Sequence, residues 1–269
     1  MKRTILLATS ALVAFAVPAF ADGKGGSHMS GLGEFGYDYT DLDDFNLDRS
    51  SFHAQGSVLW PLEGSWNVQG NFAFNTDRID TGGPDFAIDT WKFGGTAFWR
   101  QQNEGVLGGE LWYHSLDVGM GYLDGVGIAA RGEYFFSPTL TFGGRIAYSN
   151  YDGGTSIDEW TINALGRYYA QPNLGLTLGV NYSSLNDDGG EGLDDWTVRG
   201  EAEYLFADCD TSVFADVRFG SVDPDAGATD SDQWGLGLGL RLRFGTTGAL
   251  VQRDRTGPLQ ELGGAHFLF

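Results

Sequence analysis

Hydrophobic and polar residues alternate strictly over several segments of the chain. Between Gln233 and Gly245, apolar or aromatic residues occupy every second position, and mostly glycine or arginine fills the positions between them. Residues 196–206 and 160–169 repeat this pattern. A period of two residues is that of a β-strand whose two faces meet different surroundings. The chain is therefore predicted to be all-β, although a soluble sandwich would produce the same alternation.

A short sequence pattern is repeated at the start of five alternating segments of the chain. An aspartate lies two positions before a large apolar residue, and the unit recurs every 34 to 38 residues. The five units begin at Asp89, Asp124, Asp158, Asp194 and Asp232. Such a period also occurs in solenoids and propellers. Because each period here holds one strand going up and one coming down, we interpret each unit as a β-hairpin.

Counting these hairpins predicts twelve strands. Six ascend near Ser30–Thr40, Ser65–Thr76, Val106–Leu116, Thr139–Asn150, Leu174–Leu185 and Thr211–Gly220. Six descend near Ser51–Trp60, Ile88–Arg100, Val126–Phe136, Trp160–Tyr169, Trp196–Phe206 and Trp234–Phe244. Bacterial single-chain membrane barrels have even strand numbers. Ten or fourteen strands remain alternatives, because the first hairpin is the least regular.

The connections between the predicted strands fall into two kinds. Short ones, at 61–64, 101–105, 137–138, 171–173 and 207–210, alternate with mostly longer acidic ones. Outer-membrane barrels have short periplasmic turns and longer outer loops. The alternation therefore favours a membrane barrel over a soluble sandwich.

Aromatic residues mark the two ends of the apolar face. Two aromatic girdles flank the apolar band of an outer-membrane barrel. The residues expected in these girdles are Trp60, Trp66, Trp91, Trp99, Trp160, Tyr168, Trp196, Tyr204, Trp234 and Phe244.

The first 21 residues have the features of a secretion signal. Lys2 and Arg3 precede an apolar run, and Ala19-Phe20-Ala21 provides an A-x-A cleavage site before Asp22. A membrane-spanning helix would need about 20 apolar residues, and this run ends at Pro18. No later segment has 18 consecutive apolar residues. Residues 1–21 are therefore predicted to be removed, and the exported chain is predicted to have no helical span.

Charge and cysteine content exclude two further classes. The chain has 16 basic and 36 acidic residues and a formal net charge of −20, so nucleic acid is not an expected partner. Cys209 is the single cysteine, so no internal disulfide is expected to hold the fold together.

From about residue 30 to 245 the chain resembles porin-type outer-membrane β-barrel proteins of Gram-negative bacteria. Members of this group end in an alternating strand with a terminal Phe that the barrel-assembly machinery recognises. Residues 237–244 match that ending, with Phe244 as its last residue. The match departs from the family in position, because 25 residues follow Phe244. Either Phe244 closes a barrel spanning 22–245 and the tail 246–269 is periplasmic or lumenal, or Leu262–Phe269 is the last strand; we favour the first.

The residues that face the lumen would decide function. Those expected to line a pore are Lys92, Arg100, Glu110, Arg131, Glu133, Arg145, Arg167, Arg199, Glu201, Glu203, Asp216, Arg218, Arg241 and Arg243. Four of them, Glu133, Arg167, Glu203 and Arg241, lie seven residues below the girdle with alternating sign. They form either a constriction that selects ions or a salt-bridge network that fills the barrel.

Geometry and composition favour an open, narrow channel. A twelve-strand barrel has a backbone radius of roughly 12 Å. Many predicted lumenal positions are small, as in Gly175, Thr177, Gly179 and Ser183. We therefore expect an integral outer-membrane, porin-like channel for small polar or charged solutes, without a cofactor. The resemblance implies outer-membrane lipid and lipopolysaccharide as surroundings, and it leaves a homo-oligomer open.

Two other function classes are weaker expectations. A structural or adhesive barrel would bind partners through its acidic outer loops. An outer-membrane hydrolase would need a His beside a nucleophile, and of the four histidines His53 and His114, the latter followed by Ser115, lie in predicted strands. We expect no enzymatic activity. Loop carboxylates at Asp223, Asp225 and Asp230 form a weak candidate for a Ca²⁺ site, because they lack the rest of an EF-hand spacing.

Overall fold

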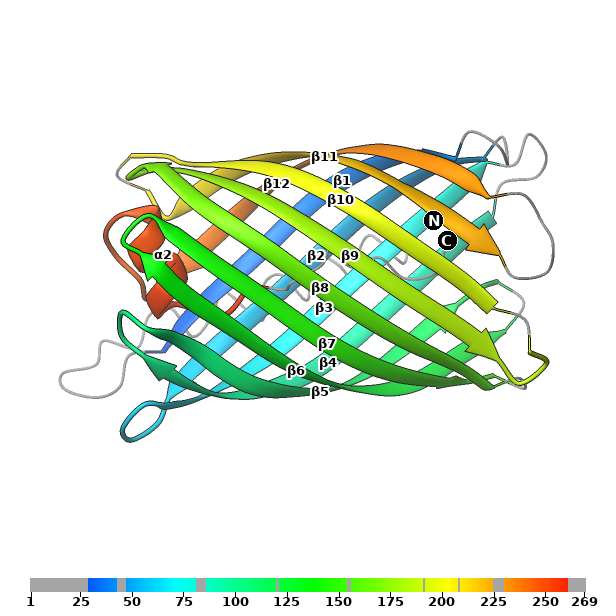
Figure 1. Cartoon of the computed structure of the whole chain (residues 1–269), viewed down its shortest axis with the longest axis horizontal. Helices are drawn as coiled ribbons and strands as arrows, with labels where there is room; N and C mark the ends of the chain where they lie inside the picture. Colours follow the sequence, from blue (N-terminus) through cyan, green and yellow to red (C-terminus); the bar gives the residue numbers. More distant parts are fainter. Residues whose placement is uncertain are drawn as a thin grey trace, which may run out of the picture.

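Twelve antiparallel strands form one closed barrel. The computed structural model describes residues 29–42, 47–80, 86–119, 121–153, 156–190, 192–207, 209–224 and 230–260. Each strand pairs with its neighbours in sequence, and β1 pairs with β12 to close the ring (Figure 1). The predicted fold class and the number of twelve strands are confirmed. The predicted signal peptide lies outside the described residues.

The strands follow the predicted order and extend beyond it mainly at the long-loop end. They are β1 (Ser30–Leu42), β2 (Leu47–Pro61), β3 (Trp66–Asp80), β4 (Phe86–Gln101), β5 (Gly105–Asp117), β6 (Tyr122–Ser137), β7 (Leu140–Asp152), β8 (Ser156–Gln171), β9 (Leu174–Asp187), β10 (Gly192–Leu205), β11 (Thr211–Pro224) and β12 (Ser231–Phe244). The extension arises because hairpin pairing continues past the apolar band, as where Asp48 pairs with Asp80.

The polarity of the barrel is the reverse of that of a soluble protein. Leu236, Leu238 and Leu240 of β12 are 50%, 60% and 46% exposed on the outer wall. Arg241 and Arg243 of the same strand are buried on the lumenal side. A soluble sandwich would bury the leucines and expose the arginines. The alternation therefore belongs to a barrel with an apolar exterior.

All ten predicted girdle residues lie on the outer face. Those more than a third exposed are Trp60, Trp66, Trp99, Trp160, Tyr168, Trp196 and Tyr204, while Trp91, Trp234 and Phe244 are partly buried by neighbours. The repeated aspartates also have a local role at the loop end of the outer wall. Tyr113 donates a hydrogen bond to Asp124 (2.9 Å), and Tyr148 donates one to Asp158 (2.6 Å). Each bond joins neighbouring strands.

Large rings cover several of the lumenal glycines. A Cβ atom on Gly36 would lie 2.3 Å from the ring of His53, and one on Gly127 would lie 2.3 Å from the ring of Trp112. These glycines leave space in which a ring lies flat against the wall. Gly36 and Gly127 therefore do not widen the lumen, whereas Thr177 and Gly179 of β9, two of the small positions named from the sequence, line a cavity.

The chain turns inward after β12. Gly245 (φ +71°) and Gly248 (φ +93°) adopt left-handed conformations that favour glycine. The helix α2 (Leu250–Thr256) follows and lies at the end of the barrel that carries the short turns (Figure 1). β12 pairs with β1 from Gln233 to Phe244, so the strand that ends at Phe244 closes the barrel. Residues 261–269, which include the alternative last strand, lie outside the described part of the chain. No helix among the described residues is long and apolar enough to span a membrane.

Candidate functional site

The fourteen charged residues predicted from the alternation all lie on the lumenal face. Most form ion pairs or hydrogen bonds with one another, and Lys92 lies over the ring of Trp112 at 4.9 Å. Two clusters result, one around Glu203 and one around Glu110. The charges are therefore largely neutralised within the wall.

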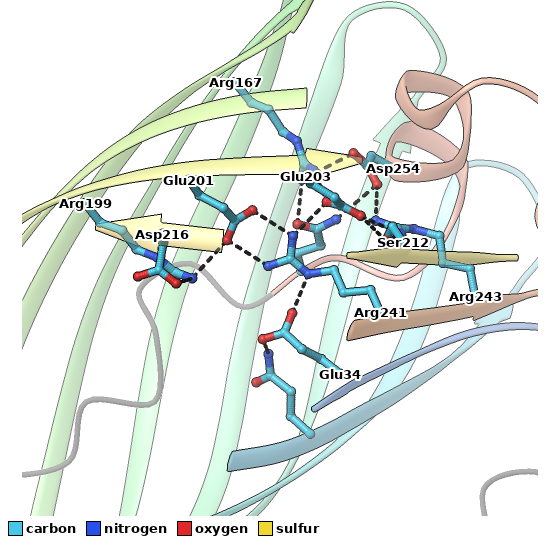
Figure 2. Close-up of polar contacts among 12 residues, drawn as sticks. Glu34, Arg167, Arg199, Glu201, Glu203, Ser212, Asp216, Arg241, Arg243 and Asp254 are labelled. Atoms are coloured by element: carbon cyan, nitrogen blue, oxygen red, sulfur yellow. Dashed lines mark hydrogen bonds and ion pairs between the residues drawn. The ribbon is translucent and has the colours of Figure 1, made fainter. Parts of the chain in front are cut away.

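Glu203 of β10 is the centre of the larger cluster. Its carboxylate accepts hydrogen bonds from Arg167, from Arg241 (2.7 Å) and from Ser212 (2.5 Å), and it forms an ion pair with Arg243 (2.7 Å). The Glu203 side chain is only 1% exposed. Figure 2 shows this carboxylate between guanidinium groups from β8 and β12. A buried carboxylate of this kind is stable only while its cationic partners stay in place.

Arg241 links Glu203 to two other carboxylates. It binds both oxygens of Glu201 (2.7 and 2.9 Å) and one oxygen of Glu34 on β1 (2.5 Å). A guanidinium group presents several donors in one plane and so can join three acids at once. The residues joined lie far apart in sequence and are brought together by closure of the barrel.

The cluster continues toward the loop end through Asp216 of β11. Asp216 accepts from Arg199 (3.0 Å) and Arg218 (2.7 Å), and Arg218 also binds Asp38. Asp38 in turn hydrogen-bonds to His53 (2.8 Å). The network therefore follows the wall over a large part of its height.

The predicted ring of alternating charge forms only in part. Arg167, Glu203 and Arg241 are in contact, but the nearest cation to Glu133 is Arg131 on its own strand (3.0 Å). Of the two interpretations, the contacts favour the salt-bridge network. Glu133 bonds along its own strand because long side chains pair with partners within reach rather than at a common height.

The smaller cluster lies on the opposite wall. Glu110 binds Arg131 (3.1 Å) and Arg145 (2.9 Å), and Arg145 also lies over the ring of Trp112 at 4.8 Å. Next to it, the lumenal face of β3 is lined by the amides Gln69, Asn71 and Asn75. One part of the lumen is thus neutral and polar.

The segment after β12 occupies the turn end of the lumen and is fixed at two apolar positions. Leu250 is fully buried against Tyr169 and Leu205. Leu259 is 3% exposed in a cluster with Leu59, Phe98, Val106 and Phe135. Neither leucine could be assigned a role from the sequence, because the tail has no period that places its side chains on one face.

Polar contacts hold the same segment. Arg100 of β4 donates to the carbonyl oxygens of Thr256 (2.8 Å) and Gly257 (2.6 Å). Arg255 of α2 donates to the carbonyl of Ser137 (2.6 Å), the last residue of β6. Burial lowers the pKa of the Arg255 guanidinium below its ordinary value. Gln69 of β3 exchanges two hydrogen bonds with the backbone of Leu259 (2.8 and 3.0 Å).

Asp254 is the one acid of α2 that points into the charged network. Its carboxylate meets Arg167 (3.2 Å), Arg243 (3.0 Å) and the hydroxyl of Tyr169 (3.1 Å), as Figure 2 shows for the two arginines. Gln260 donates a fourth contact at 3.0 Å. In the sequence, the available signal for Asp254 was a lone acid between Arg253 and Arg255.

The described part of the lumen contains small cavities. One, of about 110 Å³, is lined by Arg167, Arg199, Arg241 and Asp254, with the small residues Thr177 and Gly179 of β9 on another side. A second of about 50 Å³ adjoins Gln69 and Lys92. A third of about 40 Å³ lies toward the loop end near Arg49 and Asp195. Each is large enough for water.

The histidines considered for hydrolysis lie inside the barrel. His114 is fully buried and stacks on Tyr151, with ring centroids 4.1 Å apart. Ser115 is the next residue on β5 and therefore faces the other side of the sheet. His53 contacts Asp38 and Glu34 within the network. The pair His114 and Ser115 thus lacks the geometry of a base and its nucleophile.

The described residues contain no group of three or more His, Cys, Asp or Glu side chains placed to hold a metal ion. Of the weak Ca²⁺ candidates, Asp223 is the next-to-last residue of β11, and Asp230 is an exposed residue directly before β12. Asp225 lies outside the described residues.

Comparison with known proteins gives similarity of fold. No protein-family model and no curated protein matches the sequence. An outer-membrane channel from Pseudomonas putida F1 has a TM-score of 0.62 at 12% identity, over 84% of this chain and 99% of that one. The translocator domain of the autotransporter NalP from Neisseria meningitidis has a TM-score of 0.54 at 11% identity, over 90% and 98%. The β domain of the Bordetella autotransporter Brka has a TM-score of 0.54 at 10% identity, over 81% and 100%. This chain has the fold of outer-membrane β-barrel proteins, which accords with an integral outer-membrane location.

Proposed function

We propose that this chain is an integral outer-membrane barrel that works as a narrow, porin-like channel for passive diffusion of small polar or charged solutes. The reversed polarity of the barrel is the observation that carries the proposal. The outer wall is apolar, as lipid requires, and the lumen is lined by charged groups and amides. Charged and polar walls select solutes by size and charge at close range.

The contents of the lumen decide how narrow the passage is. Residues of the Glu203 network and the tail line the cavity of about 110 Å³, and residues of the Glu110 cluster and the tail line the one of about 50 Å³. Passage therefore requires movement of side chains or of the tail within a rigid wall. We expect a small or intermittent conductance in the full chain.

Conductance of the refolded protein in planar bilayers tests the proposal. The chain containing residues 22–269 should show small steps, and a chain ending at Gly245 should show larger ones, because α2 and Leu259 no longer occupy the turn end. Arg167→Ala should change the ratio of anion to cation permeability. Arg78→Ala removes the same charge from an exposed position near the loops and should leave this ratio unchanged.

Silence of both chains would contradict the channel, provided that each migrates as a folded, heat-modifiable barrel. The filled lumen would then favour the second candidate, a structural or adhesive barrel. That barrel would bind partners through its outer loops, several of which lie outside the described residues.

Three further features belong to the proposal. The opposite orientation of His114 and Ser115 supports a role without catalysis. The exposed aromatic girdles support contact with outer-membrane lipid and lipopolysaccharide. The terminal strand β12 with Phe244 supports delivery by the barrel-assembly machinery.

A further inference from the structure

The carboxylate of Asp254 occupies a binding site with four donors. Two guanidinium groups, a phenol hydroxyl and a side-chain amide lie within 3.2 Å of its oxygens. The Asp254 side chain is 8% exposed. Charged donors around a carboxylate give hydrogen bonds about twice as strong as neutral ones. The site is therefore specific for an anionic, oxygen-bearing group.

Three of the four donors belong to the wall of the barrel. Arg167 and Tyr169 come from β8 and Arg243 from β12, while Gln260 comes from the tail. Glu203 holds both arginines from the other side. The wall donors therefore stay in position when the tail leaves, and the site persists without Asp254.

The cavity of about 110 Å³ opens onto this site. Arg167, Arg199 and Arg241 line it together with the acids Asp254, Glu133 and Glu201. The Nε atoms of Arg167 and Arg199 are buried and have no hydrogen-bond partner among the described residues. Buried donors of this kind are normally satisfied by a partner or by water. A solute in the cavity thus meets the guanidinium of Arg167 beside the carboxylate it would replace.

We propose that the site formed by Arg167, Tyr169 and Arg243 binds the carboxylate of a small solute, which takes the place of Asp254 and releases α2 from the lumen. This inference rests on the proposed channel function and names its solute class. Exchange of one carboxylate for another preserves the charge of a buried network. A neutral solute would leave the two arginines short of one partner and does not compete.

The tail stays docked in the absence of such a solute because Leu250 and Leu259 remain in their apolar clusters. The solute binds only the released state of the site, so it shifts the population toward release in proportion to its concentration. Solute binding and opening of the turn end are thereby the same event.

Trypsin cleavage after Arg253 and Arg255 measures release without measuring transport. Both arginines contact the barrel while the segment is docked. Arg253 pairs with Asp210 (2.5 Å), and Arg255 donates to the carbonyl of Ser137, so neither side chain is free to enter the trypsin active site. The refolded full chain is treated with trypsin in succinate, chloride or sulfate at equal ionic strength, and loss of the C-terminal fragment is followed by mass. Succinate at about ten times its Kd for the released site should raise the cleavage rate about tenfold.

Variants identify the site. Asp254→Asn removes the carboxylate that two buried arginines share, so most of the tail should be released and its cleavage rate in chloride should already be near the maximum. Succinate should therefore add little to the cleavage rate of this variant. Asp210→Asn removes an ion pair of α2 outside the site and should retain the full response to succinate. For each variant, the cleavage rate in succinate is divided by the rate of the same variant in chloride. This ratio cancels any direct effect of the substitution on cleavage by trypsin.

Two results would overturn the inference. One is an equal cleavage rate in succinate and chloride; the other is an equal effect of sulfate and succinate, which would assign the site to anions in general. Because cleavage does not depend on conductance, a silent barrel whose tail responds to succinate would contradict the channel and leave the carboxylate site standing.

Discussion

At the scale of single residues, aromatic side chains in the lumen lie flat over glycines of neighbouring strands. Gly127 faces Trp112, and a Cβ atom on Gly239 would lie 2.4 Å from the ring of Phe214. The rings in turn carry cations, since Arg145 lies over Trp112 and Arg241 over Phe214 at 4.3 Å. A glycine on the lumenal face therefore supports the charged network indirectly, by leaving room for the ring beneath it.

Gly127→Ala tests this role. Its Cβ would lie 2.3 Å from the Trp112 ring, which is closer than real contacts allow, so the ring must move and disturb Lys92 and Arg145. We expect a loss of about 1–3 kcal/mol in the free energy of unfolding, measured by urea titration in lipid. Gly132→Ala lies on the outer face of the same strand, where the nearest atom is 3.5 Å away, and should be nearly neutral. Equal losses in both variants would contradict this explanation.

At the scale of elements, α2 is too short to be stable alone. Isolated helices shorter than about 12 residues are marginal in water, and α2 has seven. Its position depends on docking, through the apolar clusters of Leu250 and Leu259 and through backbone carbonyls that bind arginines. A segment held in this way can leave the lumen without unfolding the strands.

Leu259→Ala should weaken this docking. Removing a buried leucine costs about 2 kcal/mol or more, so the released fraction of the tail should rise by about thirtyfold or more while the docked state still dominates. Trypsin cleavage after Arg255 reports the change, and the heat-modifiable barrel should remain. Leu62→Ala removes the same atoms from an exposed turn position and serves as the control. A cleavage rate in Leu259→Ala equal to that of the control would show that the tail is held elsewhere.

At the scale of the whole molecule, the Glu203 cluster links strands from across the chain. β1, β8, β10, β11 and β12 all contribute, and the Arg241–Glu34 pair joins residues 207 positions apart. The cluster therefore adds side-chain contacts to the backbone pairing that closes the ring between β1 and β12.

Glu203→Gln should destabilise the closed barrel strongly. It removes the shared partner of Arg167, Arg241 and Arg243 and leaves buried positive charge uncompensated, which costs about 3–5 kcal/mol. Urea titration followed by tryptophan fluorescence measures the loss. Glu104→Gln makes the same substitution in the exposed β4–β5 turn and should change stability by less than about 0.5 kcal/mol. A similarly small effect at Glu203 would mean that the network contributes little.

The barrel, its twelve strands, the lumenal face of the fourteen charged residues and the outward face of the ten aromatic residues could all be predicted from the amino-acid sequence. These features follow from a period of two residues and from turn residues, which are local properties that can be recognised without knowledge of partners. The lumenal placement of Arg167, Glu203 and Arg241 could be predicted in the same way.

The pairing of the charges and the position of the tail became known only from the folded barrel. Glu133 pairs with Arg131 instead of joining a ring, because guanidinium groups reach along and across strands to the nearest acid. Asp254 enters the network although its segment has no alternation, because its position is set by the pockets for Leu250 and Leu259 on distant strands. Contacts of this kind depend on three-dimensional proximity, which a local pattern does not encode.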